Sequence, residues 1–218
     1  MKYSNAAKGI SKIYIAEILS ILGAVPAIII AILAAANHVD TSLSGEAAAQ
    51  TLKSANIGTA VVILGIVMIA AMLVSFILNL SGILDASKDE AGFKRALWAL
   101  FASMAFGIIA SILKSSNPRV SNWLQVPSTL FELVVTIYVL EGIGTLADNL
   151  GKKQISDMSR DCRTWLISAL VLSAAAEILV SLGSTGSVLN TTSGIAAALL
   201  QIIAYVVYLR VLSKARHM

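Results

Sequence analysis

The chain has 218 residues, of which 57% are hydrophobic and only 13% are charged, and its mean hydropathy is +0.84. A soluble domain has about 25% charged residues, so the composition excludes an ordinary soluble core. The single cysteine, Cys162, excludes an intrachain disulfide framework. The formal net charge of +4 does not indicate nucleic-acid binding, because membrane topology explains where the basic residues fall.

Long apolar segments recur along the chain with almost no charge inside them. About 20 residues of α-helix cross the hydrocarbon core of a bilayer. The sequence therefore predicts an all-α, polytopic bundle of six transmembrane helices, forming a single integral membrane domain over 1–218. The expected spans are residues 13–36, 57–84, 94–113, 128–147, 164–182 and 194–212.

The first span has a competing interpretation as a signal peptide, because lysines precede an apolar run that ends in an A-x-A pattern at Ala34–Ala36. The run has about 24 residues, however, whereas the apolar region of a signal peptide has about 7–15. We therefore expect a retained span. Pro26 within it has no N–H to donate to the carbonyl of Leu22, which predicts a kink.

Basic residues are distributed unequally between the two sides of the predicted bundle. Only three of the 16 Lys and Arg residues fall on one side, namely Lys53, Lys114 and Arg119. The others lie at the two termini and in the expected loops 85–95 and 148–163. The positive-inside rule then predicts a multi-pass protein of the plasma or inner membrane with both termini in the cytoplasm.

The outer connection before the fourth span contains "NPRVSNWLQVP", which Pro118 and Pro127 bracket. We expect this segment to be a loop, with Pro127 in the first turn of the span, where proline is favoured. Tryptophans support the predicted frame, because aromatic residues concentrate at membrane interfaces. They fall near expected span ends, at Trp98, Trp123 and Trp165.

Three segments at the expected cytoplasmic ends resemble one another: 75–87, 137–149 and 204–216. Their alignment superposes an aromatic position and, three residues later, a polar one. These positions are Phe76, Tyr138 and Tyr205, then Asn79, Glu141 and Tyr208. The helices that follow align through Lys12, Arg95 and Arg163. The pattern predicts three helical-hairpin repeats, in which spans six and one form a split pair. Shared composition alone is the alternative explanation.

Four carboxylates fall within the expected spans, and the sequence places no Lys or Arg deep enough to pair with them. They are Glu17, Glu132, Glu141 and Glu177. Ionisable groups inside a membrane usually face the bundle interior or a water-filled cavity. Glu132 and Glu177 form a secondary outer polar pair, although residues near span ends are also hydrated without any function.

Glu141 is the deepest carboxylate and belongs to a helical stripe with Tyr138, Thr145 and Asp148. Similar stripes on other spans include Glu17, Asn79 and Tyr208 at comparable depth. The sequence therefore predicts a ligand-binding cavity open to the cytoplasm. Its expected residues are Glu141, Tyr138, Thr145, Glu17, Asn79 and Tyr208. Unpaired carboxylates there suit a proton or a small cation.

No catalytic or cofactor motif is present. The two histidines, His38 and His217, lie outside the expected spans, so we predict no metal site, no cofactor and no enzyme activity. The first functional hypothesis is transport or binding of a small, cationic solute. The alternative is a non-catalytic assembly, immunity or regulatory subunit, while an intramembrane enzyme is disfavoured. Expected partners are the bilayer and a second copy or a membrane protein, with no nucleic acid.

Overall fold

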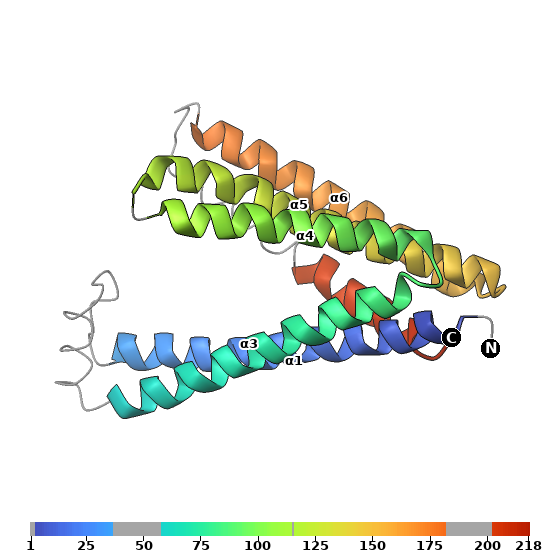
Figure 1. Ribbon diagram of the computed structural model, residues 1–218, viewed down its shortest axis with the longest axis horizontal. Coiled ribbons are helices and arrows are strands. Elements are labelled where there is room, and N and C mark those ends of the chain that lie inside the picture. Colours follow the sequence, from blue (N-terminus) through green and yellow to red (C-terminus); the bar gives the residue numbers. More distant parts are fainter. Residues whose placement is uncertain (1–2, 37–57, 115, 182–201) are drawn as a thin grey trace. The chain divides into compact units, whose positions relative to one another are not determined.

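The computed structural model describes residues 3–36, 58–114, 116–181 and 202–218 (Figure 1). These residues form six helices and thereby confirm the all-α class. The helices are α1 (Ser4–Ala36), α3 (Gly58–Ala86), α4 (Ala91–Leu113), α5 (Pro118–Asn149), α6 (Lys153–Ser181) and a C-terminal helix over 202–215. Pro26 lies inside α1, as expected.

Contacts divide the chain into two units. One is Lys12–Leu80, and the other combines Met1–Ser11 with Ser81–Met218. The expectation of a single domain over 1–218 stays a prediction.

Four of the described helices contain a stretch long and apolar enough to cross a membrane. These stretches are Ser4–Ile30, Gly58–Ala86, Ala91–Leu113 and Leu130–Asn149. They support a membrane-embedded protein and correspond to the first four expected spans. Spans five and six fall partly on residues 182 and 194–201, outside the described ranges. The six-span count, the side of the termini and the repeat therefore stay predictions.

The 12–80 unit exposes much of its apolar surface. On α3, Val62 and Ile66 are 61% and 62% exposed, whereas the buried residues of this helix are at its end, beyond the unit. Hydrocarbon chains suit such a surface, because the helix satisfies its own backbone hydrogen bonds. Between α1 and α3, the Ser75 Oγ donates to the carbonyl oxygen of Ala16 at 2.7 Å.

The segment expected as an outer loop is helical instead. Asn117 accepts a hydrogen bond from the Val120 N–H at 3.4 Å and caps α5, and Pro118 follows in the first turn. Asparagine is a preferred N-cap, and proline at the first helical position needs no N–H partner. Pro127 therefore lies inside the helix rather than at its start.

The expected cytoplasmic loop 148–163 is also mostly helical, because the chain turns within three residues. Gly151 has φ of 70°, a left-handed conformation that glycine adopts readily. The Gly151 N–H donates to the backbone carbonyl oxygen of Asp148 at 3.0 Å, and the Lys152 N–H donates to that of Ala147 at 2.8 Å. This is the Schellman pattern of a helix C-terminus. It ends α5 and allows α6 to start at Lys153.

Within the larger unit, α4, α5 and α6 lie side by side (Figure 1). A Cβ at Gly92 would lie 2.7 Å from the Gly142 Cα, so α4 and α5 approach closely there. Further along, the Ser103 and Ser128 hydroxyls each donate to the other residue's carbonyl at 3.1 Å. Small residues permit close helix contact in membranes, and such hydrogen bonds reinforce it.

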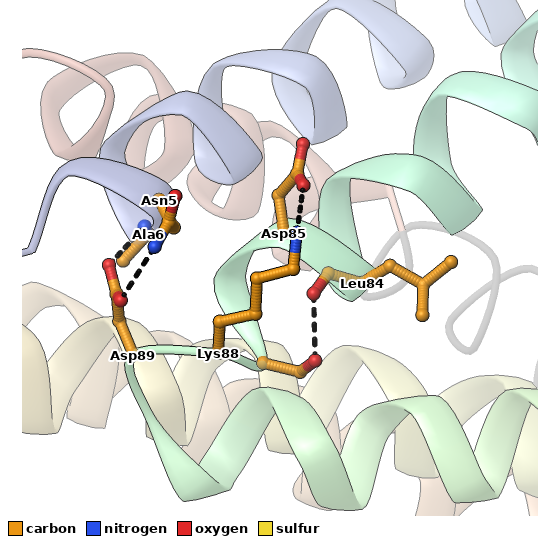
Figure 2. Close-up of polar contacts among 7 residues, drawn as sticks. Asn5, Ala6, Leu84, Asp85, Lys88 and Asp89 are labelled. Atoms are coloured by element: carbon orange, nitrogen blue, oxygen red, sulfur yellow. Dashed lines mark hydrogen bonds and ion pairs between the residues drawn. The ribbon is translucent and has the colours of Figure 1, made fainter.

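The turn between α3 and α4 is hydrogen-bonded to the start of α1 (Figure 2). One Asp89 carboxylate oxygen accepts from the Asn5 side chain at 3.1 Å, and the other accepts from the Ala6 N–H at 2.8 Å. Ala6 belongs to the first turn of α1, where N–H groups have no partner within the helix. A carboxylate from a distant part of the chain thus caps α1.

Candidate functional site

An open pocket with a cavity volume of about 90 Å³ lies between the adjoining ends of α5 and α6. Most of its lining is polar. The lining residues are Leu140, Glu141, Gly144, Thr145, Asp148, Ser156, Ser159, Arg160 and Arg163. Both helices belong to the same unit, and the tight turn at Gly151 makes them antiparallel neighbours.

Helical periodicity explains which residues line the pocket. Glu141, Thr145 and Asp148 recur every three or four positions on α5, and so share one face. Ser156, Ser159, Arg160 and Arg163 follow the same spacing on α6.

One hydrogen bond sets the register between the two helices. The Ser159 Oγ donates to the carbonyl oxygen of Leu140 at 2.5 Å. Because the helices are antiparallel, Asp148 and Ser156 lie toward the turn. Arg163 and Leu140 line the opposite end of the pocket.

The Glu141 carboxylate is ion-paired, which corrects the expectation of an unpaired group. The Arg95 Nη1 lies 2.8 Å from the Glu141 Oε1. Arg95 was expected in a loop, at the boundary of the third span, but α4 begins at Ala91 and Arg95 is part of that helix. The close approach of Gly92 to Gly142 brings the two side chains together. Arg95 compensates the charge that was expected to attract a cation.

The two arginines of α6 differ from Arg95. Neither the Arg160 nor the Arg163 guanidinium has a hydrogen-bond or ion-pair partner among the residues that the structure describes. The Asp148 carboxylate likewise has no partner within those ranges. With Glu141 compensated by Arg95, two positive groups and one negative group of the pocket have no partner within the described ranges.

The predicted site residues separate into those that line the pocket and those that do not. Glu141 and Thr145 line it, and the Thr145 hydroxyl donates to the Glu141 carbonyl oxygen at 3.0 Å. Tyr138 is not a lining residue, although it is one turn from Glu141. Tyr208 is buried at 3% exposure, with its ring 6.2 Å from that of Tyr205, and it does not line the pocket.

The remaining predicted site residues are not among those that line this pocket. Glu17 and Asn79 belong to the 12–80 unit, so their convergence with Glu141 stays a prediction. Glu132 is exposed on α5, and the Glu177 side chain lies outside the described residues. The outer polar pair therefore also stays a prediction.

Sequence reasoning missed the α6 wall of the pocket. Ser156, Ser159, Arg160 and Arg163 were assigned to a cytoplasmic loop because their segment is polar. Their spacing of three, four and seven residues is that of a helix face, and this signal was available in the sequence. Within the described ranges, no cluster of His, Cys, Asp and Glu is arranged to hold a metal ion.

Cys162 lies on α6 beside these residues but faces away from solvent. It is fully buried, and its thiol donates a hydrogen bond to the Ala204 carbonyl oxygen, with the Sγ at 3.8 Å from that oxygen. Burial raises the pKa of the Cys162 thiol to about 12, because desolvation disfavours the thiolate. The thiol therefore stays protonated near neutral pH and is a packing group rather than a nucleophile.

Comparisons of the chain with protein family models, with curated proteins and with solved structures give no match. The function is therefore inferred from the geometry and charge of the pocket.

Proposed function

We propose that this integral membrane protein binds a small polar solute in the α5–α6 pocket. The observation that carries the proposal is the unpaired charge within the pocket. Arg160, Arg163 and Asp148 line one cavity, yet none of their charged groups has a hydrogen-bond or ion-pair partner among the described residues. Charged groups near a membrane are costly unless water or a partner compensates them, and a polar ligand supplies such a partner.

The pocket adjoins the bilayer rather than a separate soluble domain. Its α5 wall, from Leu140 to Asp148, falls inside the apolar stretch Leu130–Asn149. Its α6 wall belongs to the polar first half of that helix. A solute held here lies where a membrane-spanning helix meets water. This location favours a solute binding protein or a transporter over a purely structural bundle.

We further propose the six-span topology with both termini in the cytoplasm. The unequal distribution of basic residues supports it. Further support comes from contacts of the terminal segments with the turns that precede α4 and α6. Asn5 bonds to Asp89 at 3.1 Å, and the Lys152 Nζ bonds to the carbonyl oxygen of His217 at 3.4 Å. On this topology, the pocket opens toward the cytoplasm.

The repeat belongs to the same proposal. Gly9 and Gly92 precede the aligned residues Lys12 and Arg95 by three positions. Both glycines pack closely on a neighbouring helix, Gly9 on α3 and Gly92 on α5. Arg160 occupies the corresponding position before Arg163, so the third unit differs.

The second candidate function is that of a non-catalytic membrane subunit. The Arg95–Glu141 ion pair favours it, because it gives Glu141 a structural role between α4 and α5. Such a subunit has no need to release a bound solute across the bilayer. Flux therefore distinguishes a transporter from a subunit that only binds.

The test measures solute binding to the protein in phosphatidylcholine nanodiscs by calorimetry. The probes are sodium, choline, glycine, inorganic phosphate and phosphoethanolamine. We expect at least one probe to bind the wild type, to bind Lys153→Trp equally and to lose binding in Thr145→Trp, which fills the pocket. Lys153 is exposed on α6 and does not line the pocket. The proposal is overturned if no probe binds and no lipid headgroup is retained in the pocket, or if Thr145→Trp binds equally well.

Proteoliposomes containing the bound probe then test movement. Protein-dependent release that Thr145→Trp abolishes supports a transporter. Binding without release supports the non-catalytic subunit.

A further inference from the structure

We infer that the ligand of the α5–α6 pocket is an aminophosphoester, with its phosphate against Arg160 and Arg163 and its ammonium group against Asp148. This inference rests on the proposed function and specifies the class of solute. It follows from three observations: the charge balance of the pocket, the order of charges along it, and the exposed tryptophans that follow Arg95 and Arg163 in the sequence.

The charge balance favours an anionic group as the main ligand feature. Arg95 compensates Glu141 at 2.8 Å, which leaves Arg160 and Arg163 against a single carboxylate, Asp148. A simple cation in this pocket meets two guanidinium groups. An oxyanion meets two groups whose planar N–H donors match phosphate oxygens.

Both arginines are placed to act on the same anion. They are three residues apart on α6, so they lie on one helix face. Long side chains on a helix lean toward its N-terminus. We therefore expect the guanidinium groups of Arg160 and Arg163 to extend toward the level of Ser156 and Ser159, which line the same pocket.

The charges are ordered along the pocket. The Ser159–Leu140 hydrogen bond fixes the register, so that Asp148 lies at the end nearest the turn and Arg163 at the other end. A ligand with an anion at one end and a cation at the other satisfies both. The anion then lies toward the middle of α5 and α6, and the cation lies toward the turn.

The aromatic residues around the arginines place the pocket at headgroup level. Trp165 follows Arg163 by two residues and is 49% exposed, and Trp98 follows Arg95 by three and is 69% exposed. Exposed tryptophans are typical of the interface between hydrocarbon and water. Basic pockets between helices at this level bind phosphate groups of lipids. Phosphoethanolamine has the required order of charges both as a lipid headgroup and as a free solute.

The test compares these two sources of the same chemistry. Free phosphoethanolamine is titrated into protein in phosphatidylcholine nanodiscs. Separately, native mass spectrometry measures retention of phosphatidylethanolamine against phosphatidylcholine, whose methylated ammonium group cannot donate a hydrogen bond to Asp148. Binding of the free compound identifies a soluble ligand, and selective retention of phosphatidylethanolamine identifies a lipid. Either result supports the inference when the variants below respond as expected.

Arg163→Gln should weaken phosphoethanolamine or phosphatidylethanolamine binding at least about tenfold, as expected for loss of a charge-assisted hydrogen bond. Arg163→Lys should weaken it less, because the charge remains without the guanidinium fork. Asp148→Asn should weaken binding of the aminophosphoester but strengthen that of inorganic phosphate, because it removes a negative charge from the pocket. Lys153→Gln removes the same charge as Arg163→Gln from an exposed site outside the pocket and should change nothing.

Two results overturn the inference. One is that neither source binds, and the other is that Arg163→Gln and Lys153→Gln have equal effects. If choline or sodium binds instead, and Thr145→Trp abolishes that binding, the inference fails while the proposed function stands. If no probe in the panel binds and phosphatidylethanolamine is not selectively retained, both fail.

Discussion

The Arg95 Nη1 lies 2.8 Å from the Glu141 Oε1, so an ion pair joins the start of α4 to the C-terminal part of α5 across 46 residues of sequence. The Arg95 side chain is 56% exposed and that of Glu141 31% exposed, so solvent screens the pair. The pair therefore matters more for the charge balance of the pocket than for the stability of the fold. It compensates one of the two carboxylates of the pocket, whereas the α6 arginines have no partner in the part of the chain that the structure describes.

We expect a double-mutant cycle of Arg95→Gln and Glu141→Gln to give a coupling free energy of only about 0.2–1 kcal/mol, as for partly exposed pairs. Reversible unfolding in detergent measures it. Glu141→Gln should also leave Arg95 free and strengthen phosphate binding, because the pocket becomes more positive. Additive single mutants, or weaker phosphate binding by Glu141→Gln, contradict this account of the pair.

The contact between α4 and α5 at Gly92 should not tolerate a side chain. A Cβ there lies 2.7 Å from both the Cα and the N of Gly142, and backbone atoms cannot rotate away. We expect Gly92→Ala to lower the free energy of unfolding by about 1–3 kcal/mol. Gly65→Ala is the matched control, because nothing lies within 4 Å of its Cβ position. That control should be neutral or stabilising by at most about 1 kcal/mol, since alanine favours helix. Equal free energies of unfolding for Gly92→Ala and Gly65→Ala would show that α4 and α5 are farther apart than described.

Asp89 should stabilise the first turn of α1. Asp89→Ala removes both acceptors, for Asn5 and for the Ala6 N–H, and we expect a loss of about 1–2 kcal/mol. Asp89→Asn keeps one acceptor but no charge, so its loss should be smaller. Hydrogen exchange at the Ala6 amide reports the effect locally. An unchanged rate of hydrogen exchange at the Ala6 amide in Asp89→Ala would contradict this interpretation.

Cys162 provides a test that depends on pH. Its thiol has a pKa of about 12 in the folded protein against an ordinary value of 9.0, so the folded state holds its proton more tightly than the unfolded state does. The stabilisation is complete below pH 9.0 and is lost as the pH rises from there toward about 12. The stability difference between wild type and Cys162→Ala should therefore shrink between about pH 7.5 and about pH 10.5. Both proteins share all lysines, whose titration cancels in the comparison. Parallel stability curves would contradict a buried thiol.

Apolarity predicts the first four spans well, because a stretch of uncharged residues long enough to cross the bilayer has few alternatives. It fails at helix ends, where polar residues begin but the helix continues. Both α5 and α6 start about ten residues before the expected spans, at Pro118 and Lys153. Local signals mark these starts: Asn117 before Pro118, and Gly151 between two helices.

The candidate site divides in the same way. On its α5 wall, Glu141 and Thr145 were among the expected site residues, and Asp148 belonged to the same helical stripe without being assigned to the site. Its α6 wall was missed, because the positive-inside pattern explained Arg160 and Arg163 without a helix. The Arg95–Glu141 pair depends on the register of two helices, and no local pattern in the sequence determines that register.

Site-directed labelling at Thr145 tests the central claim most directly. In a Cys162→Ala background, Thr145→Cys places the only thiol of the sequence in the pocket, and Lys153→Cys provides a control outside it. The account predicts that a charged methanethiosulfonate reagent labels both cysteines, and that phosphoethanolamine, added free or present as the lipid headgroup, slows labelling at position 145 alone. Equal labelling rates at position 145 with and without phosphoethanolamine in both forms would contradict it.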